Sequence, residues 1–202
     1  MNYDKIQLSP IERTIVGLAG IMYDAEINVL IEKNELRDIL SSGQLASKSW
    51  LLQQIKKIKG IKKILVCGGW FGVLARLIIE DNQELEVHSL DIDPRCHLVA
   101  SKLLSNGGKS ILADMNTFDY NNYDLVINTS LEHLDLSITW LNRLPQNTLC
   151  LVQSNNAINI KGHTNCHHSL EHLKQDLKFS QILFTDELVF PMYTRYMIIG
   201  IK

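Results

Sequence analysis

The sequence has no apolar run long enough to cross a membrane. A membrane-spanning helix needs about 20 consecutive apolar residues, and polar residues interrupt every apolar stretch of this 202-residue chain well short of that length. The first ten residues, MNYDKIQLSP, also lack a basic segment followed by an apolar one, which is the pattern of a secretory signal. We therefore expect a cytoplasmic protein with no membrane partner.

Cysteines are few, and their spacing is not that of a disulfide scaffold. None of them forms a CxxC pair, and three lie among apolar or helix-patterned residues; the four are Cys67, Cys96, Cys150 and Cys166. We expect reduced thiols. Because 46% of the residues are hydrophobic, a chain of this length can bury a self-sufficient core without covalent staples.

An excess of positive charge is also absent. With 20 Lys and Arg against 22 Asp and Glu, the formal net charge is −2, which argues against a general nucleic-acid binder, since such a protein needs a basic field. The local exception is a run of five lysines, Lys56, Lys57, Lys59, Lys62 and Lys63. The run is typical of a solvated helix end with cations near its negative dipole, and it is the one place where a nucleic-acid partner is not excluded.

The apolar pattern divides the chain into two parts. Ser9-Pro10 is a helix-start signal, and residues 11–58 then carry apolar positions at helical spacing, which predicts three or four helices. From Ile61 onward, short apolar runs alternate with amphipathic stretches. We therefore predict an N-terminal helical extension over residues 1–60 and an α/β domain over residues 61–202.

The second part is typical of a doubly wound, mainly parallel sheet. Strands alternate with helices, which implies parallel pairing through crossovers, whereas the short last connection permits only an antiparallel hairpin. The predicted strands cover residues 63–67, 86–91, 110–114, 123–128, 148–153, 181–190 and 195–202.

Ligands of such sheets bind beyond the carboxyl ends of the strands, so the strand ends carry the functional signal. The first strand runs into Gly68, Gly69 and Gly72, a turn that lets backbone N–H groups approach a ligand. The second ends at Asp91, whose carboxylate can accept both hydroxyls of a ribose. The third ends at Asp114-Met115, suited to the edge and face of an adenine ring.

These three features in order resemble the class I, Rossmann-like S-adenosylmethionine-dependent methyltransferases over about residues 61–202. The resemblance implies a seven-stranded sheet of order 3-2-1-4-5-7-6 with the last strand antiparallel, S-adenosylmethionine as the cofactor, and N-terminal helices that act as a lid. It places the ribose on Asp91 and the adenine beside Ile92 and Asp114-Met115. Carried onto this chain, the cofactor-binding set is Gly68, Gly69, Trp70, Gly72, Asp91, Ile92, Asp114, Met115 and Asn128.

Two positions depart from the family pattern. The family usually has an acid two residues before the first glycine, where it helps to hold the cofactor's ammonium, but this chain has Val66. Trp70 stands where the family has its middle glycine. The indole of Trp70 either faces the ligand or packs under the N-terminal helices, since large aromatic side chains usually serve packing.

The catalytic expectations rest on residues after the fourth and fifth strands. His133 is the best-placed base, because an ordinary histidine pKa near 6.5 lets it take a proton at neutral pH; it can equally be a helix-start residue bonded to backbone. Glu132 either reaches the cofactor amine or lies at a helix N-terminus. Asn128-Thr129-Ser130-Leu131 is not the (D/N)-P-P-(Y/F) motif of the nucleic-acid base amino-methyltransferases.

The loop after the fifth strand is long and polar, a kind of loop that often carries function. Asn155 and His163 are predicted to face the acceptor, with loop capping as the alternative. A histidine-rich stretch here includes His168 and His172 at helical spacing near Cys166, but no carboxylate or second cysteine completes a metal-ligand pattern. We therefore expect no metal site.

The sequence thus predicts methyl transfer to an unidentified, small-molecule acceptor, with His133, Asn155 and His163 as catalytic candidates. Two alternatives stay open. The first is an enzyme that uses S-adenosylmethionine for another reaction, aminocarboxypropyl transfer or sulfonium cleavage, because Val66 replaces the acid of the family pattern. The second is a non-catalytic interaction protein on the same scaffold, because of Trp70. The oligomeric state is not predicted.

Overall fold

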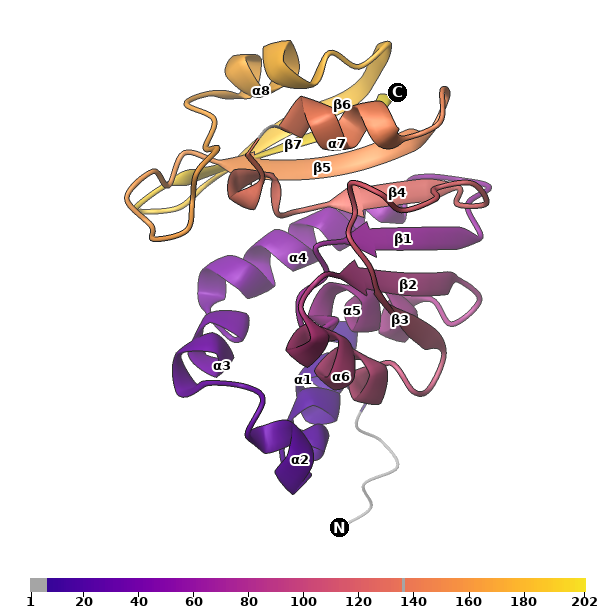
Figure 1. The fold of residues 1–202 in the computed structure, drawn as a ribbon, viewed down its shortest axis with the longest axis vertical. Coiled ribbons are helices and arrows are strands. Elements are labelled where there is room, and N and C mark those ends of the chain that lie inside the picture. The colour runs from indigo at the N-terminus through magenta and orange to yellow at the C-terminus, as the bar shows by residue number, and fades with distance from the viewer. Residues whose placement is uncertain (1–6, 136) are drawn as a thin grey trace.

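The computed structural model describes residues 7–135 and 137–202, and its centre is a seven-stranded sheet (Figure 1). The sheet order is β3-β2-β1-β4-β5-β7-β6. Strands β1 to β5 pair in parallel, and β7 is antiparallel to both β5 and β6. The predicted fold class and strand order are therefore confirmed. The strands are β1 (Lys63–Cys67), β2 (Glu86–Asp91), β3 (Gly108–Leu112), β4 (Leu125–Asn128), β5 (Leu149–Asn155), β6 (Gln181–Val189) and β7 (Thr194–Ile201).

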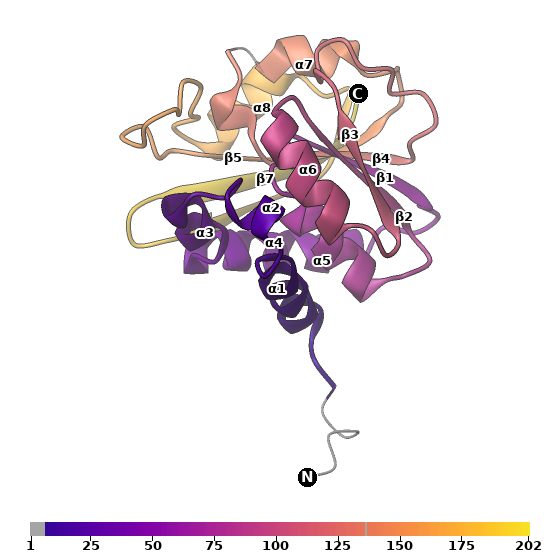
Figure 2. The same ribbon diagram turned by 60° about the horizontal axis from the view of Figure 1, so that its bottom comes forward.

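Helices cover both faces of the sheet, because consecutive strand residues point to opposite faces and the central strands are apolar at both. One face packs against α4 (Ser42–Ile55), α5 (Val73–Asp81) and α6 (Pro94–Leu103). The other packs against α7 (Ser137–Arg143) and α8 (Leu170–Leu177), with Trp140 fully buried between them and the strands. Figure 2 shows α7 and α8 on one side of the sheet and α4 and α5 on the other.

The N-terminal part forms four helices, as its apolar period predicts. The first, α1 (Pro10–Ile21), begins at Ser9, which forms a capping box with Glu12. It is followed by α2 (Ala25–Asn28), α3 (Lys33–Ile39) and α4. The first three share an apolar cluster with α5 and α6. Helix α4 packs on the sheet itself, where the buried Gln153 side chain donates a hydrogen bond to the carbonyl of Ser47 at 3.3 Å.

The bounds of the last five strands differ from the prediction by one or two residues, and those of the fourth and third have local causes. The fourth strand begins at Leu125 rather than at residue 123, because the Asp124 carboxylate accepts the backbone N–H groups of Lys62 and Lys63, each at 2.8 Å. The third covers Gly108–Leu112 rather than 110–114. Gly108 pairs with Val87, so the strand starts earlier, and Asp114 lies in a following turn.

The lysine run lies at the amino-terminal ends of the parallel strands, because Lys63 begins β1. The carboxyl ends, where Cys67 ends β1, are on the opposite side of the molecule. Lys56 pairs with Asp81 at 2.7 Å, and Lys63 pairs with Glu86 at 3.0 Å. Among the described residues, no helix has the length and apolar character needed to cross a bilayer.

Candidate active site

A cavity of about 460 Å³ lies beyond the carboxyl ends of β1, β2 and β4, with α3 and α4 on its other side. This is where a doubly wound sheet places its ligand. Seven of the predicted site residues line it, namely Gly68, Gly69, Trp70, Asp91, Ile92, Met115 and His133. Asp38, Lys48, Glu132 and Arg195 also line it, so the cavity carries several ionisable groups.

The turn between β1 and α5 forms the floor of the cavity. Gly69 allows close approach to β2, because a Cβ built there would lie 2.0 Å from the Ser89 hydroxyl. Gly72 has φ +80° and precedes α5, and a Cβ there would lie 3.0 Å from that of Ala100. Gly72 therefore shapes the turn and packs against Ala100. The sequence predicts that it contacts the cofactor, but it does not line the cavity.

Asp91 holds this turn in place and still faces the cavity. One carboxylate oxygen accepts the Trp70 backbone N–H at 2.8 Å, and the other accepts the Asp93 N–H at 3.0 Å. Burial raises the pKa of Asp91, while these N–H donors oppose the rise. Each oxygen keeps acceptor capacity for a further donor, so the side chain can bind a diol in the cavity.

Met115 is the part of the predicted adenine element that reaches the cavity. The Tyr120 hydroxyl donates to the Met115 carbonyl at 2.5 Å. Asp114 turns away instead, because its carboxylate accepts the Asn116 N–H at 2.8 Å. Asn128 is fully buried behind Met115; its side-chain oxygen accepts the Ser130 N–H at 2.9 Å. Asp114 and Asn128 therefore shape the cavity wall and do not line it.

Trp70 combines the two roles that its sequence position left open. It has the left-handed φ of +51°, which is uncommon for a bulky residue. Its ring stacks obliquely on Phe71, with centroids 4.9 Å apart, and packs against the cluster of the N-terminal helices. It also lines the cavity, as does Val66, so this wall offers a ligand apolar surface where the family usually has an acid.

Besides Asp38 and Asp91, the cavity is lined by the carboxylate of Glu132, in the short 3-10 helix η2 (Leu131–His133) after β4. The side chain is only 3% exposed. Its Oε1 accepts from Asn155 Nδ2 at 2.6 Å and lies 3.5 Å from an Arg195 nitrogen, whereas Oε2 has no partner. Asn155 is thus buried behind Glu132 and holds it, so the prediction that Asn155 faces an acceptor does not match its position.

Two histidines lie beside Glu132 although 30 residues separate them in the sequence. The rings of His133 and His163 meet edge to face, with centroids 4.9 Å apart. Nδ1 of His133 lies 3.0 Å from the Gly162 carbonyl, and Nδ1 of His163 lies 3.0 Å from the Ala157 carbonyl. Burial is the main cause that lowers the pKa of His163, which favours the neutral ring. His133 lines the cavity, and His163 stands behind it.

Lys48 comes from the N-terminal helices that the resemblance makes a lid, and Arg195 is a site residue that the sequence did not single out. Arg195, the second residue of β7, pairs with Asn155 of β5, and this antiparallel pairing brings it to the cavity. Lys48 projects from α4 and bonds the Gln44 side chain. Burial is the main cause that lowers the pKa of Lys48 to about 7; the charge of Arg195 adds to this, and Asp38 and Glu132 oppose it. A strongly shifted pKa in a cavity is typical of functional sites.

The lowered pKa of Lys48 predicts a pH-dependent stability. Between the folded pKa of about 7 and the unfolded lysine value of about 10.4, the unfolded chain binds the proton more tightly, so stability rises with pH. From about pH 7 to about pH 9, the wild type should gain roughly 1–2 kcal/mol relative to Lys48→Met. Urea unfolding of both proteins at the two pH values measures this difference, and equal pH dependence would contradict it.

Buried Ser154 and His167, with the partly exposed Asp176, form a chain of hydrogen bonds that anchors the loop that carries His163. The Ser154 hydroxyl lies 2.7 Å from His167 Nδ1, and His167 Nε2 lies 3.2 Å from Asp176. The three residue types are those of a hydrolase triad, but Ser154 is fully buried. A substrate cannot reach the hydroxyl, and the chain of hydrogen bonds is therefore structural.

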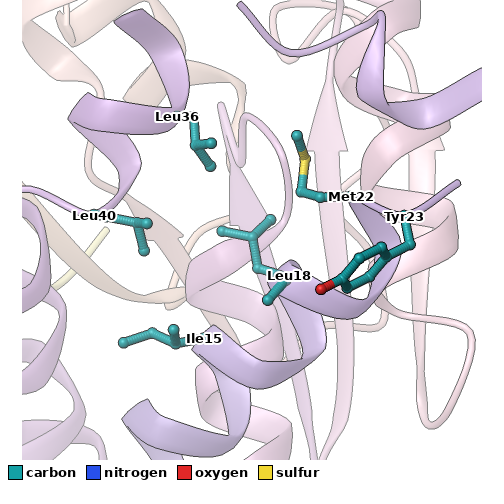
Figure 3. Close-up of a pocket in the computed structure, with 7 residues that line it drawn as sticks. Ile15, Leu18, Met22, Tyr23, Leu36 and Leu40 are labelled. Atoms are coloured by element: carbon teal, nitrogen blue, oxygen red, sulfur yellow. The ribbon is translucent and has the colours of Figure 1, made fainter. Parts of the chain in front are cut away.

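A second cavity, of about 280 Å³, lies between α1 and α3 (Figure 3). Its lining is almost wholly apolar, with Ile15, Leu18, Met22, Leu36 and Leu40 directed into it. Its described lining holds no carboxylate, histidine, cysteine, lysine or arginine, and its polar side-chain group is the Tyr23 hydroxyl. The chemistry therefore belongs to the first cavity.

Comparison with known proteins identifies the fold. Neither protein-family models nor curated proteins give a match to this sequence. Among solved structures, the N-methyltransferase NodS from Bradyrhizobium japonicum WM9, in complex with S-adenosyl-L-homocysteine, aligns at a TM-score of 0.67 and 11% identity. The alignment covers 96% of this chain and 99% of that one.

Two further structures give the same result. The plantazolicin methyltransferase BpumL was solved in complex with a monoazolic desmethylPZN analogue and S-adenosylhomocysteine. It aligns at a TM-score of 0.63 and 13% identity, and the alignment covers 94% of this chain and 97% of that one. A methyltransferase from Aquifex aeolicus aligns at 0.59 and 13%, covering 88% and 97%. The resemblance to class I methyltransferases is therefore confirmed at the level of the fold.

Proposed function

We propose that this protein is an S-adenosylmethionine-dependent methyltransferase. The observation that carries the proposal is Asp91, a half-buried carboxylate at the end of β2 that faces a cavity of small-molecule size. Solved structures of the same fold were crystallised with S-adenosylhomocysteine, the product of methyl transfer. In this proposal Asp91 binds the ribose, Ile92 and Met115 border the adenine, and the Gly68–Gly69 turn lies under the methionine chain.

The bound cofactor supplies an electrophilic methyl group, and the chain's residues position the acceptor in line with it. Since direct displacement has no other covalent step, a base is needed only for a protonated acceptor. Two groups on the acceptor side of the cavity can take that proton. Lys48 has a pKa of about 7, and His133 is exposed at the cavity edge.

A small-molecule acceptor fits the dimensions of the site better than a polymer does. A cavity of about 460 Å³ is within the ordinary size range of small-ligand sites, and the cofactor would occupy part of it, which leaves room only for a small acceptor group. The lysine run is the one sequence feature that does not exclude a nucleic acid. It lies at the amino-terminal ends of the strands, whereas the cavity lies at their carboxyl ends. A polymer held there would not present a group to the site.

Calorimetric titration with S-adenosylhomocysteine tests the cofactor. We expect saturable binding with one site per chain, and a folded protein that gives no heat at millimolar ligand would refute the proposal. Product analysis after incubation with S-adenosylmethionine and an acceptor pool then tests the reaction. S-adenosylhomocysteine as the product supports methyl transfer.

Val66 is the observation that favours a second candidate, a different reaction of the same cofactor. Because an apolar residue lines the cavity where the family usually has an acid, the methionine chain would be held differently, and aminocarboxypropyl transfer or sulfonium cleavage would follow. Methylthioadenosine as the product would identify either of these. Binding of the cofactor without any product would instead support a non-catalytic role.

A further inference from the structure

Glu132, His133 and His163 form a group with the composition of a metal site. Each offers one ligand atom, and the three atoms lie within 4.8 Å of one another. Ligands held about 2.1 Å from a tetrahedral zinc ion are roughly 3.4 Å apart, so small side-chain rotations would complete the site. The two histidines come from different segments, η2 and the loop after β5, and the fold brings them together.

The loop is fastened to the segment that carries the other two residues. The N–H groups of Thr164 and Asn165 both donate to the Glu132 carbonyl, at 2.9 and 3.1 Å. Asn165 also donates from its side chain to the Ser137 hydroxyl at 2.7 Å. His163 is therefore held next to Glu132 by backbone hydrogen bonds from the two residues that follow it.

The hydrogen bonds of the histidines select the tautomer that binds metal. Nδ1 of each ring faces a backbone carbonyl, of Gly162 for His133 and of Ala157 for His163. A carbonyl only accepts, so Nδ1 carries the hydrogen in both rings and Nε2 keeps its lone pair. Fixing a ring through its second nitrogen in this way is the usual outer-shell support of metal-bound histidine.

Glu132 supplies an unused donor atom. Its side chain is 97% buried, given its 3% exposure. Asn155 and Arg195 take Oε1 and leave Oε2 without a partner. An ionised carboxylate oxygen that is buried without a hydrogen bond is costly, and a bound cation would remove that cost.

We propose that Glu132 Oε2 and the Nε2 atoms of His133 and His163 bind a divalent transition-metal ion such as Zn²⁺ at the edge of the cavity. Two imidazoles and one carboxylate form a ligand set of catalytic zinc sites, which keep further positions open. The two imidazole nitrogens favour Zn²⁺ over Mg²⁺, which relies on oxygen ligands. The positive charge of Arg195, 3.5 Å from Glu132, opposes either cation.

The open positions of this ion would face the cavity, since Glu132 and His133 line it. If methyl transfer is the reaction, the ion would lower the pKa of an acceptor hydroxyl bound to it. This role rests on the proposed function, whereas binding of the ion does not.

Titration of the metal-free full chain with Co²⁺ as a spectroscopic stand-in for Zn²⁺ tests the site. We expect one ion per chain, visible absorption bands, displacement by Zn²⁺ and no competition from Mg²⁺. His133→Asn and His163→Asn should each weaken the binding at least tenfold. His133 is exposed, so its substitution keeps the test valid if Glu132→Gln or His163→Asn fails to fold.

The matched control is the double variant His168→Asn/His172→Asn, which removes two histidines at helical spacing outside the group. It should bind Co²⁺ as the wild type does. Absence of stoichiometric binding, or binding that survives His133→Asn and His163→Asn but is lost in the control variant, would overturn the proposal. S-adenosylhomocysteine titration of the same samples reports on the proposed function independently.

Discussion

Replacing Asp91 with alanine should abolish detectable cofactor binding. The variant loses the acceptor of both ribose hydroxyls, and hydrogen bonds to a charged group contribute about 1.5–3 kcal/mol each. The dissociation constant for S-adenosylhomocysteine should therefore rise by a factor of about 100 or more. The Trp70 N–H, 2.8 Å from this carboxylate, also loses its partner, so the turn that forms the cavity floor is loosened as well.

Calorimetry of wild type, Asp91→Ala, Asp91→Asn and Asp119→Ala measures this effect. Asparagine keeps one acceptor oxygen and should bind with intermediate affinity. Asp119 is an exposed turn residue whose carboxylate accepts the N–H of Asn121, and its alanine variant should bind like the wild type. Wild-type affinity in a folded Asp91→Ala protein would remove Asp91 from the ribose role.

The largest loss of stability is expected from Glu132→Ala. Glu132 and Arg195 are almost fully buried and lie 3.5 Å apart. Removing one partner of a buried ion pair leaves an uncompensated charge and costs about 3–5 kcal/mol. This is a large part of the roughly 5–15 kcal/mol that stabilises an ordinary domain. Asn155 Nδ2, 2.6 Å from Glu132, loses its acceptor too.

Urea unfolding of Glu132→Ala, Arg195→Ala and the double variant tests the pair. The double variant should lose less than the sum of the two single losses, because each single change already breaks the interaction. The control is Glu171→Ala, which breaks an exposed pair with Lys174 and should cost no more than about 0.5 kcal/mol. A loss in Glu132→Ala no greater than in this control would refute the burial argument.

The fold could be predicted because its signals are local. Apolar runs such as residues 63–67 mark buried strands, and the switch from helical to strand patterns near Ile61 marks where the sheet begins. The ends of the strands are harder to predict, because side chains also compete for backbone donors. The Asp124 carboxylate, for example, accepts the N–H groups of Lys62 and Lys63 at the start of β1. The order of the strands came from the family resemblance and not from these patterns.

The site could be predicted only where a strand end determines it. Asp91 follows directly from the end of β2, but Arg195 reaches the cavity because β7 inserts antiparallel beside β5. His133 and His163 are separate catalytic candidates in the sequence, and no pattern there indicates that they meet. Asn155 looks like a loop residue by its neighbours, yet the continuation of β5 to this position buries it. Pairing between distant segments decides all three cases.

The hydrogen bond between Gln153 and the Ser47 carbonyl bears on how ligands exchange. Swinging α4 away from the sheet would break this buried bond and expose Leu51, Leu52 and Ile55. Each of these side chains contributes about 1.5–3 kcal/mol through burial, so the open state would be too rare to serve as the route of ligand exchange. Cofactor and product must then pass through the mouth of the cavity with α4 in place. Measured release rates should therefore respond to substitutions at α3 and η2 more than to those at the foot of α4.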